Sequence, residues 1–376
     1  MRTSPMLKSQ KMVTDLLSRA GITINGKGKA DIQVHNQGFY QRVLRDGSLG
    51  VGESYMEGWW DVEELDTCVE KVLRADIYGK GLSPVFFLEL WKAKILNQQS
   101  KLRSKRVAEQ HYDLGNDLYE KMLDPRMQYT CAYWKKARNL NEAQEHKLDL
   151  ICRKLHLTET DRVLELGCGW GGFARFAAEK YGCRVTAYNI SKEQVAWGRE
   201  KCRGLPVDIH LRDYREAQGI YHKVVAIGLC EHIGYKNYNS FLKLIHRCLA
   251  DDGLALIHTI AGNKSTVTTD AWLDKYIFPG SMLPAPAQMA KCIDGRFVLE
   301  DWHNFGPDYD RTLMAWFENF DRNWQSIKSE TYDDRFYRMW KYYLLMCAGS
   351  FRARKNQLWQ IVLSKKGLSG GYESVR

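Results

Sequence analysis

Titratable side chains stand near the ends of two apolar segments. Glu231 and His232 lie in LCEHIG, and His258 lies in LIHTI. In open α/β sheets, ligands bind at the carboxyl ends of the parallel strands, so these groups are interpreted as functional rather than structural. A hydrogen-bonded histidine in the core of the sheet is the alternative for His258.

A glycine-rich turn is the second chemical signal. The segment ELGCGWGG has the form acidic-x-G-x-G-x-G and contains Glu165, Gly167 and Gly169. Glycines allow a tight turn and the close approach of a ligand. Because no Gly-Lys-Ser/Thr follows, the segment does not fit a triphosphate-binding loop. A carboxylate here can hold a cationic group, and S-adenosylmethionine carries both an ammonium and a sulfonium. A tight packing turn without a ligand is the alternative.

Two further segments could hold a nucleoside. The second predicted strand ends at Asn189, where nucleotide-binding sheets usually place an acidic residue for the ribose hydroxyls. Asn189 or Gln194 could replace that residue, although Gln194 also fits a capping box with Ser191. After the third strand, Asp213 and Tyr214 are placed to meet the edge and face of an adenine. A simple helix cap is the alternative for Asp213.

A parallel sheet is needed to position these groups. From residue 147 onward, short apolar runs alternate with segments of helical spacing, which predicts an α/β, Rossmann-like fold. Two late strands are expected, separated by two helices rich in aromatic residues. The predicted strands are RVLELGC, CRVTAYNI, VDIHL, KVVAIGL, LALIHTI, RFVLEDW and LWQIVLSK.

The whole chain is expected to divide into a small, mostly helical N-terminal domain (1–90), a basic linker (91–108) and a catalytic domain (109–376). Within the first, KMVTDLLSRAGITI predicts a helix that ends at Gly21. The segment GSLGVGESYMEGWW is interpreted as a glycine-punctuated loop that exposes its two tryptophans.

Charge and composition restrict the partners. The chain has 376 residues and a net charge of +10, which favours an anionic partner such as nucleic acid, a phospholipid surface or an acidic metabolite. Residues 91–108 are either a solvated linker or a membrane-surface contact. No apolar run approaches the ~18 residues of a membrane span. No signal peptide is recognised and no cysteines form a C-x-x-C pair, so reduced thiols, a cytoplasmic location and no metal site are expected.

Several motifs together resemble the cyclopropane-fatty-acyl-phospholipid synthase family and its mycolic acid relatives. They extend from about residue 109 to 325, and GESYMEGWW continues the likeness into the N-terminal part. The matching segments are EQHYDLGNDLYEKMLD, MQYTCAYW, VLELGCGWGGFARF, LCEHIG, LIHTI, KYIFPG and DWHNFGPDYDRTLMAWFENF.

The resemblance implies an S-adenosylmethionine methyltransferase fold, a bound bicarbonate ion and transfer of a methylene group to the cis double bond of an unsaturated phospholipid. The anion site would contain Cys131, Glu231, His258, Ile260 (by its backbone) and Tyr309, with Cys131 as a compact wall and not a nucleophile. Tyr129, Thr130, Gly167 and Gln194 would line the cofactor site. A homodimer at the inner face of the cytoplasmic membrane, without nucleic acid, is expected.

Three alternatives remain at this point. Some relatives transfer the methyl group without closing a ring or quench the cation with water. The positive charge would also suit an RNA-binding protein or RNA methyltransferase, although no RNA-binding module motif is present. A catalytically inactive scaffold on a lipid surface is the third.

Overall fold

The computed structural model describes residues 5–76 and 115–376. The basic linker 91–108 and both predicted domain boundaries lie outside the described residues. Within residues 5–76, the N-terminal part contains two short paired strands and three helices. Its elements are α1 (Pro5–Arg19), β1 (Gln33–Val34), α2 (Gly38–Met56), β2 (Trp60–Asp61) and α3 (Leu65–Arg74). The predicted stop of the first helix is confirmed, because Gly21 has a φ of 66°, a left-handed conformation that favours glycine.

A seven-stranded sheet forms the larger part, with strand order β5-β4-β3-β6-β7-β9-β8. Strands β3 to β7 pair in parallel, whereas β9 runs antiparallel to both of its neighbours. The predicted strands are all present. Their bounds are β3 (Arg162–Leu166), β4 (Arg184–Asn189), β5 (Val207–Leu211), β6 (Tyr221–Ile227), β7 (Leu249–Gly262), β8 (Val298–Asn304) and β9 (Asn356–Ser364).

Helices cover both faces of this sheet. One buried cluster joins the sheet to α7 (Leu140–Lys154), α8 (Gly172–Tyr181) and α9 (Lys192–Lys201). A second cluster on the other face joins it to α11 (Tyr238–Cys248) and α13 (Pro286–Ile293). Alternate residues of the inner strands enter the two clusters, as expected for strands buried on both faces. The architecture is therefore the predicted α/β, Rossmann-like sheet.

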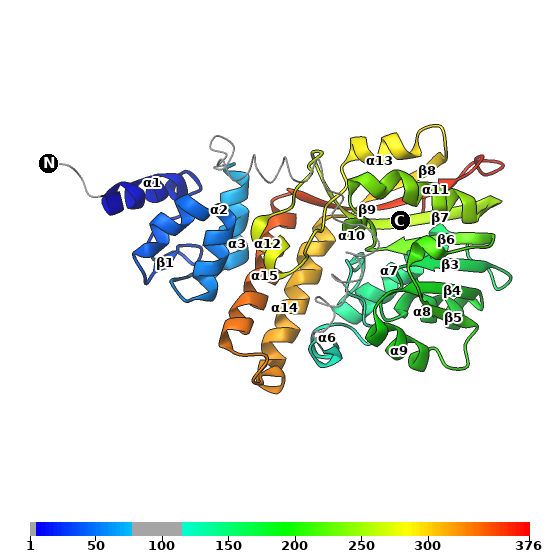
Figure 1. Cartoon of the computed structure of the whole chain (residues 1–376), viewed down its shortest axis with the longest axis horizontal. Helices are drawn as coiled ribbons and strands as arrows, with labels where there is room; N and C mark the ends of the chain where they lie inside the picture. Colours follow the sequence, from blue (N-terminus) through cyan, green and yellow to red (C-terminus); the bar gives the residue numbers. More distant parts are fainter. Residues whose placement is uncertain (1–4, 77–114) are drawn as a thin grey trace.

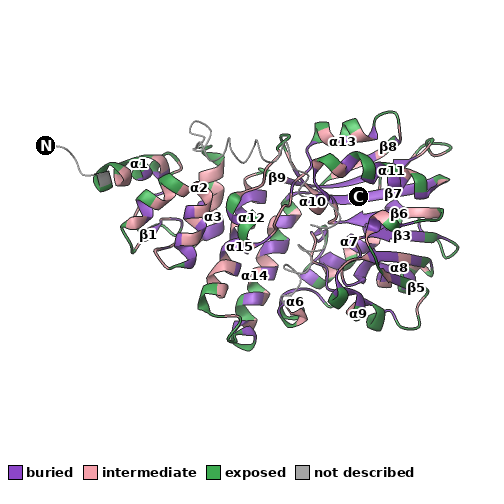
Figure 2. Cartoon of the chain, viewed as in Figure 1, coloured by how far each residue is buried: buried purple, intermediate pink, exposed green. Residues whose placement is uncertain are grey.

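Two long helices stand between the sheet and the N-terminal part. They are α14 (Pro307–Ile327) and α15 (Asp334–Arg352), and the short helix α6 (Asn116–Met122) packs beside α14. Figure 1 shows α1 to α3 at one end of the molecule and the sheet at the other. Figure 2 shows buried residues along the facing sides of α14 and α15. The aromatic-rich segment found in the sequence is therefore the core between the two parts.

The predicted glycine-punctuated loop is wrong, because most of it belongs to helix α2. The helix kinks at Gly47, which has a φ of 57°, and then continues to Met56. Gly52 is needed for packing and not for a turn, since a Cβ there would lie 2.3 Å from Trp272 Cδ1 on α12 (Ala271–Tyr276). Trp60 is only 2% exposed and donates from Nε1 to the carbonyl oxygen of Val51. It is a core residue and not the exposed side chain that was predicted.

Ion pairs reinforce the contact of the N-terminal part with the rest of the chain. Glu53 on α2 accepts from Lys275 Nζ at 2.6 Å and from the hydroxyl of Tyr276 at 2.9 Å, both on α12. Burial alone would raise the pKa of Glu53, but the hydrogen bonds from Lys275, Arg42 and Tyr276 lower it to about 2. The carboxylate is therefore charged at neutral pH and holds the two parts together.

The close contact between Gly52 and Trp272 predicts a stability defect. Gly52→Ala should lower the free energy of unfolding by about 1–3 kcal/mol, because a methyl group would be forced into a packed indole. Chemical denaturation would measure it. Gly262→Ala is a matched control, since a Cβ there would lie 3.6 Å from the nearest atom, an ordinary contact. Equal stability of the two variants would show that α2 and α12 can separate at little cost.

Candidate active site

The segment QYTCAYW, residues 128–134, is a strap without regular secondary structure that is held between two helices. From α7, Gln144 Nε2 donates to the carbonyl oxygen of Thr130 at 2.9 Å. From α14, the hydroxyl of Thr312 accepts from Trp134 Nε1 at 2.9 Å. The strap and its cysteine are therefore fixed relative to both helices.

A buried lysine also holds the strap. Lys147 lies one turn after Gln144 on α7, and its Nζ donates to Gln128 Oε1 at 2.5 Å and to Thr130 Oγ1 at 2.9 Å. Its side chain is fully buried, and burial lowers its pKa to about 8 although the nearby acidic groups favour the charged form. Lysine is almost never buried without partners, and Gln128 and Thr130 supply them here, so Lys147 fixes the strap to α7.

The glycine turn follows β3 and opens α8. Gly167, Gly169 and Gly171 have φ values of 77°, 53° and 75°, which L side chains adopt only with strain. A Cβ at Gly169 would meet no atom within 4 Å, so the turn faces open space there. The alternating glycines are thus required by the backbone, and they leave room for a ligand beside the turn.

Asn189 connects the glycine turn to α9. Its Nδ2 donates to the carbonyl oxygen of Gly169 at 2.9 Å and to Gln194 Oε1 at 2.8 Å. The hydroxyl of Ser191 accepts from the backbone N–H of Gln194, as predicted for a helix cap. The prediction that Gln194 completes a capping box is wrong, because its side chain accepts from Asn189 Nδ2 and does not bond to the backbone of Ser191. Three predicted cofactor residues therefore lie together at the ends of β3 and β4.

Glu165 is buried beneath the same turn. It is 2% exposed, its Oε2 has no hydrogen-bond partner, and burial raises its pKa to about 8. Nearby Lys147 and the backbone N–H of Ala174 oppose this rise. The carboxyl group thus stands below the turn with one oxygen unused.

Glu231 is tied to the sheet by a short hydrogen bond. It lies on α10 (Cys230–Ile233) directly after β6, and its Oε1 accepts from the backbone N–H of Ile260 at 2.6 Å. Strand β6 ends at Ile227, opposite His258, so β7 continues beyond it and the N–H of Ile260 meets a side chain instead of a strand. Burial raises the pKa of Glu231 to about 7, and its Oε2 has no partner. This oxygen is available to a ligand.

His258 is buried on β7 and has one free nitrogen. Its Nδ1 lies 3.3 Å from Gln360 Nε2, whereas its Nε2 has no partner. Burial lowers the pKa of His258 well below its usual range, and nearby Lys147 and Lys154 lower it further. The imidazole is therefore neutral. The core-histidine alternative accounts for Nδ1 but leaves Nε2 unexplained.

Cys131 and Tyr309 are neighbouring uncharged groups, and Tyr309 also lies near Glu231. Burial raises the pKa of the Cys131 thiol well above its usual range, and its Sγ donates to the carbonyl oxygen of Ala132 at 3.2 Å. Burial raises the pKa of Tyr309 in the same way, and nearby Cys131 and Glu231 add to the effect. A thiol without thiolate character is a poor nucleophile.

Aromatic rings lie between these groups. The ring centroid of Trp316 lies 5.2 Å from that of Tyr129 and 5.9 Å from that of Tyr309, and its indole N–H has no partner. The hydroxyl of Tyr129 bonds to that of Tyr343 at 2.8 Å. Aromatic faces of this kind stabilise cations.

Asp213 and Tyr214 have structural contacts. Asp213 Oδ1 accepts from the backbone N–H of Arg215, which is the helix-cap alternative, and its Oδ2 accepts from the Arg215 guanidinium. The ring of Tyr214 packs edge-on against Phe241 with a centroid distance of 5.8 Å. The adenine contact of these two residues stays a prediction.

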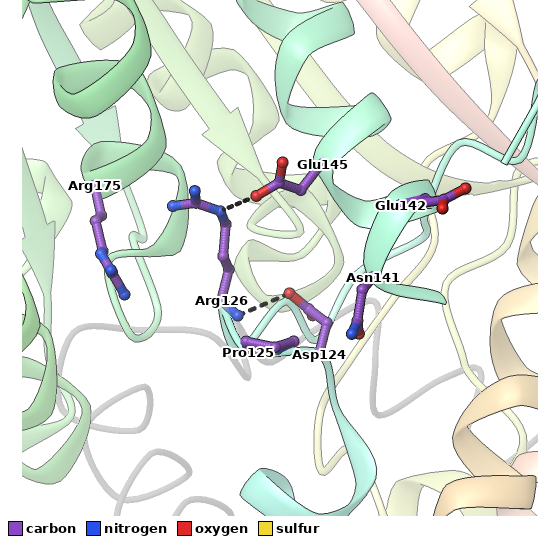
Figure 3. Close-up of a pocket in the computed structure, with 7 residues that line it drawn as sticks. All are labelled: Asp124, Pro125, Arg126, Asn141, Glu142, Glu145 and Arg175. Carbon is purple, nitrogen blue, oxygen red and sulfur yellow. Dashed lines mark hydrogen bonds and ion pairs between the residues drawn. The ribbon is translucent and has the colours of Figure 1, made fainter. Parts of the chain in front are cut away.

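A charged hollow lies apart from these residues. It measures about 330 Å³ and contains none of the predicted site residues (Figure 3). Arg126 crosses it and pairs with Glu145 at 2.8 Å. It is lined by Asp124, Pro125, Arg126, Asn141, Glu142, Glu145 and Arg175.

Four buried polar side chains of the site were not predicted from the sequence. Gln144 and Lys147 are polar residues on the buried face of α7, three positions apart, and that break in the apolar stripe was the available signal. Gln360 and Trp316 gave no signal, since one polar residue in a strand and one tryptophan in an aromatic helix are ordinary.

Comparison with known proteins identifies the family of the chain. A family model described as mycolic acid cyclopropane synthetase matches residues 99–361. A cyclopropane-fatty-acyl-phospholipid synthase from Escherichia coli (strain K12) is 48% identical over 369 residues, which are 97% of this chain and 96% of the relative.

Solved structures show the same fold. The mycolic acid cyclopropane synthase CmaA1, complexed with SAH and CTAB, is 30% identical with a TM-score of 0.63, over 69% of this chain and 98% of that one. A coclaurine N-methyltransferase bound to N-methylheliamine and SAH, 22% identical, gives a TM-score of 0.69 over 84% of this chain and 99% of its own, a likeness of fold alone. The predicted methyltransferase fold is confirmed.

The contacts of Lys147 generate a test of ligand binding. Lys147→Met should weaken binding of S-adenosylhomocysteine at least about tenfold, since loss of hydrogen bonds from a charged group costs about 1.5–3 kcal/mol and releases Thr130. Isothermal calorimetry would measure this. Lys154→Met is the control, because Lys154 is a buried lysine on the same helix that bonds to Asp301 instead. Equal affinity of both variants would contradict a role of Lys147 in the ligand site.

Proposed function

Because the chain belongs to the mycolic acid cyclopropane synthetase family, we propose that it transfers a methylene group from S-adenosylmethionine to the cis double bond of an unsaturated phospholipid acyl chain and closes a cyclopropane ring. The relative from Escherichia coli supports this choice of substrate, because the likeness covers nearly all of both chains. Within the molecule, the proposal rests on two unpartnered buried atoms, Glu231 Oε2 and His258 Nε2.

These atoms support a bound bicarbonate ion. Buried polar atoms normally have hydrogen-bond partners, so two unused ones near the ends of β6 and β7 suggest a polar ligand. Bicarbonate has a hydroxyl that can donate and oxygens that can accept. Glu231 would accept from the hydroxyl, whereas His258 and Tyr309 would donate to the oxygens. Ile260 would act through Glu231, since its N–H already holds that carboxyl group.

The methyl donor would be held on the other side of Thr130. Gly167, Gly169, Asn189 and Gln194 are proposed to receive its nucleoside, with Asp213 and Tyr214 as further candidates at the adenine. Tyr129 and Thr130 would line the sulfonium end, where an aromatic face favours a cation. The unused oxygen of Glu165 supports the suggestion of a cationic or donor group above the turn.

The chemistry explains why the site combines these groups. An alkene is a weak nucleophile, so its attack on the methyl group requires that the two be held in line. Methyl transfer leaves a carbocation on the acyl chain, and loss of a proton from the new methyl group lets the ring close. A bound bicarbonate would supply the base for that proton. Glu231 orients the anion, while the aromatic rings around Trp316 exclude water that would quench the cation.

Incubation with monounsaturated phospholipid vesicles and S-adenosylmethionine would test the proposal. A gain of one CH2 in the acyl chains with loss of the olefinic protons is the expected result. A gain of CH2 with an olefin retained, or of CH2 and water, would indicate methyl transfer without ring closure. Methylated RNA in a parallel reaction, or no release of S-adenosylhomocysteine with either substrate, would overturn the proposal in favour of the RNA enzyme or the inactive scaffold.

The protein must also reach its substrate. Among residues 5–76 and 115–376, no helix combines the length and apolar character needed to cross a bilayer. Docking as a homodimer at the inner face of the cytoplasmic membrane remains a proposal, and sedimentation equilibrium would test the oligomeric state. Trp60 is excluded from the docking surface by its burial.

The basic linker is the proposed docking segment. Lys101→Glu combined with Arg103→Glu should reduce binding to anionic vesicles, because basic residues near such a surface contribute about 1 kcal/mol each. Added salt should weaken binding of the native chain in the same co-sedimentation assay. Undiminished binding of the folded double variant would remove the linker from the docking surface and leave the catalytic proposal intact.

The orienting role of Glu231 predicts a split between binding and turnover. Glu231→Gln should bind S-adenosylhomocysteine within about twofold of the native protein but lose turnover by at least about 100-fold, the range typical of acid–base groups. Glu159→Gln removes an exposed carboxylate and serves as the control. A parallel loss of affinity and turnover would place Glu231 in the methyl-donor site instead.

The same variant should change the pH dependence of stability. The pKa of Glu231 rises from 4.5 to about 7, so its contribution to stability is full below pH 4.5 and is lost as the pH rises to about 7. Glu231→Gln cannot ionise and does not lose stability in this way. The free energy of unfolding of the variant, minus that of the native protein, should therefore increase from pH 5 to pH 8, by on the order of 3 kcal/mol at most. Thermal unfolding at both pH values would measure the change.

A further inference from the structure

Resting on the proposed function, we propose that Gln360 is a positioning residue that sets the tautomer of His258, so that the imidazole presents an N–H donor to the bound anion. Gln360 lies on β9 and touches none of the groups proposed to react. It would act only through His258.

The sheet register places Gln360 beside His258. Strands β7 and β9 run antiparallel, and His258 and Gln360 are directly paired across them. Directly opposed residues in an antiparallel pair point to the same face of a sheet. Gln360 is completely buried, so no water competes for its amide. The arrangement is a property of the strand pairing and does not depend on a mobile loop.

The geometry defines which nitrogen carries the proton. Gln360 Nε2 lies 3.3 Å from His258 Nδ1, and an amide nitrogen can only donate. The neutral imidazole has one N–H and one lone pair, so Nδ1 must accept and the proton must reside on Nε2. Nε2 is the nitrogen without a partner. The ring nitrogen that is free to contact a ligand is therefore an N–H donor.

A second imidazole lies on the other side of Gln360. His303 on β8 is directly paired with Gln360, and Lys154 Nζ lies 3.2 Å from His303 Nδ1. Burial and the charge of Lys154 lower the pKa of His303 to about 3. Both rings beside Gln360 are thus neutral. Because His303 Nδ1 accepts from Lys154, the one ring proton of His303 resides on Nε2, and Gln360 Oε1 has no hydrogen-bond partner.

The tautomer decides what the site can hold. With the proton on Nε2, His258 donates to an oxyanion. With the proton on Nδ1, the lone pair of Nε2 would face the anion and repel it. A glutamate at position 360 could only accept a hydrogen bond. It would therefore draw the proton of His258 to Nδ1 and reverse the tautomer. The glutamine at position 360 therefore favours an anion beside His258 Nε2. The opposite tautomer of His258 would favour a hydrogen-bond donor such as water.

Nitrogen NMR of the protein with 15N-labelled histidine tests the tautomer directly. Protonated and unprotonated ring nitrogens have well-separated shifts, and the signals of His258 can be assigned by their loss in His258→Asn. The native protein, without added bicarbonate, should show a protonated Nε2 and an unprotonated Nδ1. Protonation at Nδ1 in the native protein would overturn the proposal. This measurement is independent of whether the protein makes cyclopropane rings.

Variants then test the consequence for the anion. Gln360→Glu should move the proton to Nδ1 and raise the bicarbonate concentration for half-maximal activity at least tenfold, with affinity for S-adenosylhomocysteine within twofold. Gln357→Glu is the control, since Gln357 lies three residues away on the same strand and its Oε1 accepts from Arg354. If a folded Gln360→Glu reverses the tautomer but leaves the bicarbonate dependence unchanged, Gln360 has only a structural role and the proposal fails.

Discussion

The hydrogen bond from the backbone N–H of Ile260 to Glu231 is the contact on which the site depends. Because β7 continues beyond β6, the N–H of Ile260 on that edge has no strand to bond, and a side chain from the turn after β6 satisfies it. This fixes one carboxyl oxygen and leaves the other without a partner in a buried place. The raised pKa of Glu231 is the electrostatic cost of that arrangement.

The strap 128–134 places uncharged groups beside Tyr309, which lies near this carboxyl group. Its contacts to α7 and α14 keep Cys131 as a buried thiol, so the cysteine contributes size and weak polarity and no charge. The opening half of the strap bonds to Lys147, which brings the predicted methyl-donor residues Tyr129 and Thr130 next to the proposed anion site. One short segment therefore belongs to both halves of the proposed reaction.

Burial acts on every titratable group of the site in the same sense. It lowers the pKa of Lys147, raises those of Glu165 and Glu231 and keeps His258 neutral. Such a site resists permanent charge of either sign, and a cationic donor and an anion that enter together would neutralise each other. The packed aromatic core between α14, α15 and the N-terminal part offsets the stability that these buried groups cost.

The sequence by itself determined the order of strands and helices, the glycine turn and the residues that stand at the strand ends, because these features follow from local periodicity and from glycine's backbone freedom. It failed at GSLGVGESYMEGWW, where Gly52 serves helix packing against Trp272, 220 positions later in the chain. Lys147 was missed although it interrupts the apolar stripe of α7, and Gln360 gave no signal in the sequence. Which nitrogen of His258 is free, and which oxygen of Glu231, was decided only by the tertiary structure, since both depend on pairing between strands that are distant in sequence.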